Sequence, residues 1–302
     1  MKFAQLIHNP NAGEGDDLTD KLIIALEEAG YECSYSSTKE EGWEKLSSPI
    51  DFIVVAGGDG TIRKTALELM DKRLPIGLIP VGTANNIAKT LQIEGTPAEI
   101  ISQWKTENKK KFDVGRIYNL AQQKFFLEGM GFGLFPQLIQ EMKKQKKEDP
   151  SAAKDIKTAL ETFHDIILKY KAHECMIEID EAQYSGKFLM VEIMNTSLIG
   201  PNLHLVPMAD PGDGVFEVVL ITESQREELA QYVLNKIMGK EQPAFFNILK
   251  AKKLKIFWKG IHLHVDDEYI KLDEKKEIKI ELQEDGLQFL LTDEMPIYHG
   301  DR

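Results

Sequence analysis

Residues 57–61 read Gly-Gly-Asp-Gly-Thr, and this turn most limits how the chain can fold. Residues 52–56 before it are all apolar, and residues 62–70 after it carry apolar side chains at helical spacing. A strand that ends in glycines and opens into a helix lets backbone N–H groups approach an anion, and the helix N-terminus adds partial positive charge. An aspartate in such a turn favours a bound cation or an oriented reacting group. The turn therefore predicts nucleotide-dependent phosphoryl transfer.

Two further glycine-containing turns follow other expected strands. Residues 9–13, Asn-Pro-Asn-Ala-Gly, come after an expected strand at 3–7. Residues 80–86, Pro-Val-Gly-Thr-Ala-Asn-Asn, come after one at 76–79. Open α/β sheets bind ligands at the carboxyl ends of their strands, where all three turns are expected. We therefore expect the three turns to surround one ligand.

The order of the expected elements predicts an open parallel α/β domain followed by a β-sandwich-like domain with helical insertions. Up to about residue 115, strand and helix signals alternate, which indicates a mostly parallel sheet with helices on both faces. Beyond it, stretches with strand character dominate. Helices are expected at 132–147, 151–170 and 224–238. Strands are expected at 124–128, 175–179, 188–194, 215–221, 254–258, 261–265, 278–282 and 287–291.

Charge and cysteine content argue against several classes of function. The 302 residues carry a formal net charge of −12, which argues against duplex nucleic acid as a general partner. The two cysteines form neither a disulfide framework nor a metal-binding spacing, as is typical of a reducing cytosol. No apolar run approaches the ~20 residues of a membrane-spanning helix, so we expect a cytoplasmic chain that meets any lipid from the water side.

The three turns, in this order, resemble the hallmarks of the diacylglycerol kinase catalytic-domain superfamily, which includes bacterial lipid kinases, sphingosine kinases and, more distantly, NAD kinases. The resemblance extends over nearly the whole chain. Four later segments are similar to further family segments: Lys-Phe-Asp-Val-Gly at 111–115, Gly-Met-Gly-Phe-Gly at 129–133, Pro-Met-Ala-Asp-Pro-Gly-Asp-Gly at 207–214 and Val-Asp-Asp-Glu at 265–268. It implies a nucleotide-binding domain at 1–118, onto which the tail 292–302 packs back, and a lipid-substrate domain at 119–291.

The resemblance implies an ATP- and Mg²⁺-dependent kinase that phosphorylates the hydroxyl group of a diacylglycerol-like or related lipid. Asp266 would accept the proton of that hydroxyl, and Glu268 would hold Asp266 in place. Asp59 would act near the phosphates and Mg²⁺ with support from Asp113, and Asp213 resembles part of a structural magnesium site. The implied nucleotide-binding residues are Asn9, Gly13, Gly57, Gly58, Gly60, Thr61, Gly82, Thr83 and Asn85.

Three positions depart from the family pattern. Asn86 stands where an aspartate is usual, and Gly133 stands where several members carry an acid that helps to recognise the lipid head group. Asp267 replaces the glycine of an Asp-Gly-Glu motif, which disfavours a left-handed backbone at this position. Two alternatives therefore stay open: a kinase for a soluble substrate, of the NAD kinase-like type, and a nucleotide- or lipid-binding protein that has lost catalysis.

Residues 132–147, from Phe132 to Lys147, combine an apolar helical stripe with a basic end. Such a stripe is typical of a core-facing helix with a solvated terminus. The basic end also makes this segment the candidate for a peripheral contact with an anionic membrane surface. A homodimer stays open.

Overall fold

The structure is a computed structural model, and it describes residues 1–13, 17–47, 49–148, 155–240 and 246–292. It divides into two compact units, Met1–Phe112 with Asp285–Arg302, and Asp113–Glu284. The functional assignment of domains 1–118 and 119–291 stays a prediction. Residues 293–302 of the tail lie outside the described residues, so its packing stays a prediction as well.

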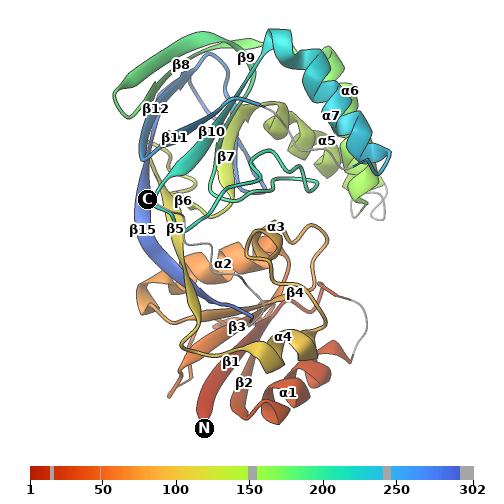
Figure 1. Cartoon of the computed structure of the whole chain (residues 1–302), viewed down its shortest axis with the longest axis vertical. Coiled ribbons are helices and arrows are strands. Elements are labelled where there is room, and N and C mark those ends of the chain that lie inside the picture. The colour runs from red at the N-terminus through yellow and green to blue at the C-terminus, as the bar shows by residue number, and fades with distance from the viewer. Residues whose placement is uncertain (14–16, 48, 149–154, 241–245, 293–302) are drawn as a thin grey trace. The chain divides into compact units, whose positions relative to one another are not determined.

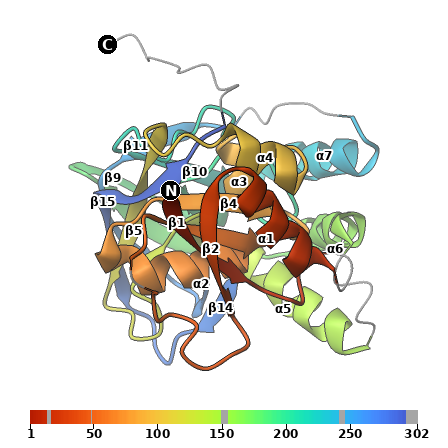
Figure 2. The ribbon, with the colours of Figure 1, turned by 90° about the horizontal axis from the view of Figure 1, so that it is seen from below.

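The first unit is a parallel sheet with helices on both faces (Figure 1). Its strands lie in the order β4-β3-β1-β2, and each neighbouring pair is parallel. α1 and α4 contact each other on one face of the sheet, whereas α2 packs against β3 on the other face. Figure 2 shows these elements from below. The elements are β1 (Lys2–His8), α1 (Leu18–Glu28), β2 (Tyr31–Ser37), β3 (Phe52–Gly57), α2 (Asp59–Leu69), β4 (Ile76–Pro80), α3 (Asn86–Thr90) and α4 (Pro97–Gln103).

Among the described residues, the second unit consists mainly of antiparallel strands and three α-helices. Its strand neighbours are β14-β13-β7-β9-β8-β12-β15, with β10 between β9 and β11, and β6 beside β5. The strands are β5 (Lys109–Tyr118), β6 (Phe125–Phe126), β7 (Gly129–Gly133), β8 (His173–Ile179), β9 (Ala182–Met194), β10 (Phe216–Thr222), β11 (Ile248–Ala251), β12 (Lys253–Trp258), β13 (His262–Val265), β14 (Glu268–Lys271) and β15 (Glu277–Leu290). The helices are α5 (Leu134–Glu148), α6 (Ile156–Lys169) and α7 (Arg226–Ile237).

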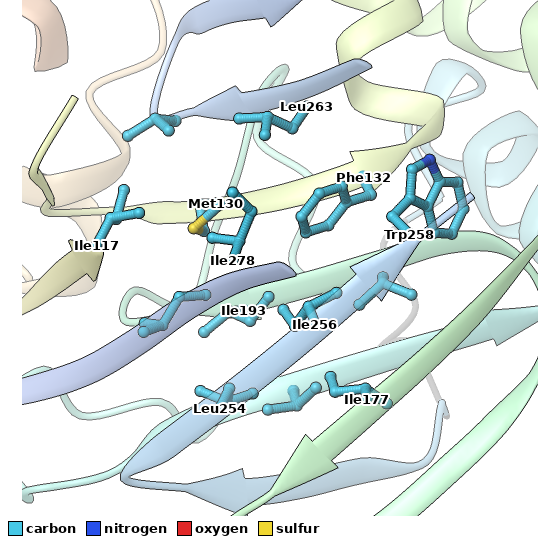
Figure 3. Packing of buried hydrophobic residues seen from close by; sticks show 14 of the residues in the cluster. Ile117, Met130, Phe132, Ile177, Ile193, Leu254, Ile256, Trp258, Leu263 and Ile278 are labelled. Atoms are coloured by element: carbon cyan, nitrogen blue, oxygen red, sulfur yellow. The ribbon is translucent and has the colours of Figure 1, made fainter. Parts of the chain in front are cut away.

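Two hydrophobic cores stabilise the second unit. In one, side chains from strands of the sandwich meet directly, as Figure 3 shows for Met130, Phe132, Ile256 and other residues. In the other, α5, α6 and α7 cover the opposite face of β9 and β10. The expected fold class, α/β followed by a β-sandwich-like domain with helical insertions, is confirmed.

One strand assignment from the sequence is wrong. The strands expected at 278–282 and 287–291 are a single strand, β15, which continues through the polar residues 283–286. Its first part pairs with β12, and Phe289 near its end pairs in parallel with Ile76 of β4. Asp285 has a φ of +54° inside this strand, a local irregularity that a turn-like sequence causes without ending the strand.

Candidate active site

Two glycine turns of the first unit pack backbone against backbone. A Cβ atom added to Gly82 would lie 2.3 Å from the Cα atom of Gly58, and one added to Gly58 would lie 3.1 Å from that of Gly82. Backbone atoms cannot move aside as the end of a flexible side chain can, so this approach requires glycine. The turns that follow β3 and β4 therefore form one continuous surface of backbone.

The first turn joins this surface. The side-chain amide of Asn9 donates a hydrogen bond of 3.2 Å to the hydroxyl of Thr61. Gly13 has a φ of +87°, and a Cβ atom there would lie 3.3 Å from Cβ of Val81. Gly57 leaves room for the Thr61 side chain, which would lie 2.5 Å from a Cβ atom at residue 57. The turns after β1, β3 and β4 thus lie together at one edge of the sheet.

Asp59 connects two of these turns. Its carboxylate accepts hydrogen bonds from the backbone N–H groups of Asn86, at 2.9 Å, and Ile87, at 3.0 Å. These N–H groups belong to the first turn of α3, where a helix leaves its donors without partners of its own. Asn86 stands where the family usually has an aspartate, but this replacement does not disturb the contact with Asp59, because the backbone N–H of residue 86 donates the hydrogen bond.

Asn85 closes the turn after β4. It has a φ of +53°, a conformation that asparagine adopts more readily than most residues. Its side-chain oxygen accepts from the N–H of Gly82, and its amide donates to the carbonyl of Gly82, each at 3.0 Å. Thr83 in the same turn and Gly60 in the turn after β3 are exposed. Asn85 therefore shapes the backbone surface, whereas Thr83 and Gly60 are accessible to a ligand.

In the second unit, Asp266 lies in a two-residue loop with Asp267 between β13 and β14. Its carboxylate accepts hydrogen bonds of 2.8–3.2 Å from the successive N–H groups of Leu127, Glu128 and Gly129. Its own N–H donates to the carbonyl of Gly129 at 2.8 Å. Consecutive N–H groups that surround an anion form a backbone nest. Asp266 is thus a buried carboxylate held in one orientation.

The loss of glycine at residue 267 disfavours a left-handed backbone there, and the structure does not require one. The left-handed residue of this loop is Asp266, with a φ of +51°, and Asp267 is exposed. The replacement of glycine by Asp267 therefore strains no left-handed residue. The carboxylate of Glu268 accepts a hydrogen bond of 2.5 Å from Gln123, and its role in holding Asp266 stays a prediction.

Asp113 ties two other segments of the second unit to this loop. Its carboxylate accepts from the N–H of Gly214 at 2.9 Å, and its own N–H donates to the carbonyl of Pro211. The side-chain amide of Asn195 donates to the carbonyls of Asp113 and Leu127, each at 2.9 Å. Asn195, which the sequence analysis missed, thus links Asp113 to the backbone that surrounds Asp266.

Glu217 is a buried acidic residue near the segment 207–214. Burial, together with the negative charges of Asp213 and Asp210, raises the pKa of Glu217 to about 7, although Lys250 opposes the shift. The ammonium group of Lys250 lies 3.3 Å from the carboxylate of Asp213. Within the described residues, no group of three or more His, Cys, Asp or Glu side chains is arranged to hold a metal ion. The magnesium roles of Asp59, Asp113 and Asp213 stay predictions.

A second residue that the sequence analysis missed is Glu192 on β9. Its carboxylate is fully buried, and Oε2 lies 3.0 Å from Nε2 of His264, which is also buried. In the sequence, Glu192 is the single charged residue of the otherwise apolar stretch 188–194, and this pattern could have indicated a buried carboxylate. A buried carboxylate needs a specific partner, because burial without one is costly.

Two family models match separate parts of the chain. The model described as "Diacylglycerol kinase catalytic domain" matches residues 4–117. The model described as "YegS C-terminal NAD kinase beta sandwich-like domain" matches residues 150–271. The first match includes all three glycine turns, and the second includes Asp213 and Asp266.

Similar proteins match most of the chain. A diacylglycerol kinase of Staphylococcus aureus (strain MRSA252) is 27% identical over 285 residues, which are 89% of this chain and 86% of that protein. One from Staphylococcus haemolyticus is 26% identical over 89% of this chain and 82% of that protein. The crystal structure of a putative diacylglycerol kinase from Bacillus anthracis has a TM-score of 0.76 at 22% identity, covering 97% of this chain and 99% of that one, and so supports the fold.

Proposed function

The chain belongs to the diacylglycerol kinase catalytic-domain superfamily and is a kinase that phosphorylates a lipid hydroxyl group, and we propose that it transfers the γ-phosphoryl group of ATP, with Mg²⁺, to a diacylglycerol-like lipid. The observation that carries the proposal is the packing of the Gly58 and Gly82 turns into one backbone surface beside the N-terminus of α2. Backbone N–H groups and the positive end of a helix together suit a polyphosphate.

Mg²⁺ would enter this site with the nucleotide. Proteins usually bind this ion through one or two carboxylates, while phosphate oxygens and water supply the remaining ligands. Asp59 lies between two of the turns and is the carboxylate we assign to this role. Bound there, the ion would neutralise charge that develops on the transferring phosphoryl group.

Asp266 is our candidate for the general base. A base must be held within hydrogen-bond reach of the proton that it accepts, and the N–H groups of residues 127–129 fix its carboxylate. Oδ1 accepts a hydrogen bond from each of these three N–H groups, and Oδ2 also accepts one of 3.2 Å from Leu127.

The departures from the family pattern favour an active kinase over a binding protein without catalysis. Asn86 keeps the backbone contact to Asp59, and Asp267 leaves the loop around Asp266 in place. Neither residue removes a contact that the proposed reaction uses. The acid that is replaced by Gly133 concerns the head group of the lipid rather than phosphoryl transfer.

We further propose a peripheral membrane contact at the basic end of α5. Phe132, Phe135 and Leu138 are buried in the cores, so the apolar stripe faces the protein. The exposed side chains at the end of the helix are Lys143, Lys144, Lys146 and Lys147. No described helix is long and apolar enough to span a bilayer. A lipid substrate lies in a membrane, and exposed lysines are suited to contact with an anionic membrane surface.

Transfer of label from γ-labelled ATP tests the proposal. The chain is incubated with Mg²⁺ and, separately, with diacylglycerol in mixed micelles, a sphingoid base, or NAD. We expect label in the phosphorylated diacylglycerol, and no transfer when Mg²⁺ is chelated. Label in NADP alone would instead identify a soluble-substrate kinase, and absence of label from every acceptor would contradict phosphoryl transfer.

A further inference from the structure

Three residues of neighbouring strands form one row across the sheet of the second unit. In the strand register, His264 of β13 is opposite Gly131 of β7, and Gly131 is opposite Glu192 of β9. The side chains of His264 and Glu192 meet above the glycine, with 3.0 Å between Nε2 and Oε2. A Cβ atom at Gly131 would lie 2.1 Å from Oε2 of Glu192. Gly131 therefore lets two residues two strands apart form a direct contact.

The row is sealed from solvent. His264 and Glu192 are 1% and 0% exposed, and the ring of Phe135 on α5 packs edge-on against His264 at 5.6 Å between centroids. Phe135 in turn stacks on Phe163 of α6 at 5.0 Å. A polar pair at this depth is retained only when its hydrogen bonds are made, because desolvation is otherwise uncompensated.

The other nitrogen of His264 reaches the candidate base. Nδ1 lies 2.8 Å from the backbone carbonyl oxygen of Asp266. A carbonyl oxygen can only accept, so Nδ1 carries a proton and donates it. Nε2 then shares one further proton with Glu192, either as a protonated histidine with a carboxylate or as a neutral histidine with a carboxylic acid. Glu192 thus fixes the orientation of the imidazole, and the imidazole holds the peptide of Asp266.

We propose that Glu192 and His264 are positioning residues, which hold the left-handed peptide of Asp266 so that its carboxylate stays within the N–H groups of residues 127–129. Their catalytic effect rests on the proposed function, in which Asp266 is the base. Neither residue touches substrate. Loss of either would let Asp266 turn away from these N–H groups, and misplacement of a catalytic group by about 1 Å can cost on the order of 10²-fold in rate.

The test combines hydrogen exchange with kinetics in the full chain. Glu192→Ala and His264→Phe should each speed amide exchange of the 127–129 segment by at least about tenfold. They should also lower kcat by about 10–100-fold and leave KM for ATP unchanged. A loss of this size is typical when a residue that orients the ligands of a metal site is removed. Glu192→Gln should keep both properties close to wild type, because its amide can donate to the neutral Nε2 of His264.

Two further variants separate positioning from general loss of stability. Met190→Ala removes a buried side chain two residues away on the same face of β9, and should lower thermal stability without changing exchange at 127–129 or kcat. The double variant Glu192→Leu with His264→Phe replaces both partners by apolar groups, which restores folding where a single change leaves a buried polar group unpaired. It should still show fast exchange.

The readouts also distinguish this proposal from the proposed function. Fast exchange at 127–129 in the disrupted variants supports positioning even if the wild type phosphorylates no lipid, in which case the proposed function fails alone. Wild-type exchange at 127–129 in Glu192→Ala, His264→Phe and the double variant would overturn the positioning role. Wild-type kcat in an active, folded double variant would overturn its catalytic consequence.

Discussion

At Asp266, local strain and local stabilisation oppose each other. A left-handed backbone costs a residue other than glycine roughly 1–2 kcal/mol. Each hydrogen bond from an N–H group to a charged carboxylate contributes about 1.5–3 kcal/mol, and Asp266 accepts from three such groups. The hydrogen bonds outweigh the strain, so the conformation is the consequence of the contacts around it. A carboxylate fixed in this way loses little freedom when a substrate hydroxyl binds.

The buried pair below this loop predicts a dependence of stability on pH. Burial raises the pKa of Glu192 despite the opposing charge of His264. Burial lowers the pKa of His264, but the Glu192 carboxylate and Asp266 outweigh it and raise that pKa overall. Both directions mean that the folded pair retains its shared proton to a higher pH than the unfolded chain does.

Stability from this pair should be complete below about pH 6.5, the ordinary pKa of histidine, and should fall as pH rises through the raised pKa of the pair. Urea unfolding at pH 6 and pH 8.5 measures the effect, which cannot exceed about 1.4 kcal/mol per pH unit for one proton. Glu192→Gln serves as the reference, because it removes the shared proton. A constant difference in unfolding free energy between the two proteins at both pH values would contradict the assignment.

Helix α5 packs in the core at its N-terminal end and is exposed at its C-terminal end. Its first turns contribute Phe135 and Leu138 to the core, while its last turns present exposed lysines. Lys144 also forms an ion pair of 2.8 Å with Glu141, so it contributes less than the other lysines to the attraction of an anionic surface. The rest of the basic charge faces solvent.

Replacement of Lys143, Lys144, Lys146 and Lys147 by Ala should weaken binding to vesicles that contain anionic lipid. Each basic residue near such a surface contributes about 1 kcal/mol, so we expect a loss of at least about a hundredfold in affinity, measured by vesicle sedimentation at low salt. The matched control replaces Lys252, Lys253, Lys255 and Lys259 on or beside β12, which changes the net charge equally. Equal weakening in both variants would show that only total charge matters.

The sequence predicts an element well when the residues that determine it are neighbours in the sequence, and poorly when contacts with distant strands determine it. The glycine turns were predictable because glycines follow apolar strands, and packing at Gly58 and Gly82 requires them. The helix α4 was missed although Thr96 and Glu99 form a capping box, a signal present in the sequence. β15 was divided in two because residues 283–286 are typical of a turn, and only pairing with other strands keeps them extended.

The candidate site shows the same limit. Asp266 and Asp59 were found from motifs, which are local in the sequence. Glu192, Asn195 and the N–H groups of residues 127–129 act through contacts between residues more than 60 positions apart, which a single sequence does not reveal. The motif raises the question of a left-handed backbone only at residue 267, where glycine is missing, whereas Asp266 is the residue that adopts it.

At the scale of the whole molecule, the proposed reaction uses both compact units. The first unit offers a backbone surface suited to a polyphosphate, and the second holds a buried carboxylate in one orientation. Phosphoryl transfer to a lipid needs both, since nucleotide binding without a base and a base without nucleotide are each inactive. Nucleotide binding and turnover should therefore be separable by substitution.

Asp266→Asn tests this division most directly. An amide cannot accept the hydroxyl proton, yet its oxygen still accepts hydrogen bonds from the N–H groups of residues 127–129. Calorimetric titration with an ATP analogue and Mg²⁺ and transfer of labelled phosphate to diacylglycerol are measured on the same preparation. We expect unchanged nucleotide affinity and a kcat about 10²–10⁴-fold below wild type. Wild-type turnover in this variant would contradict the role of Asp266 as the general base.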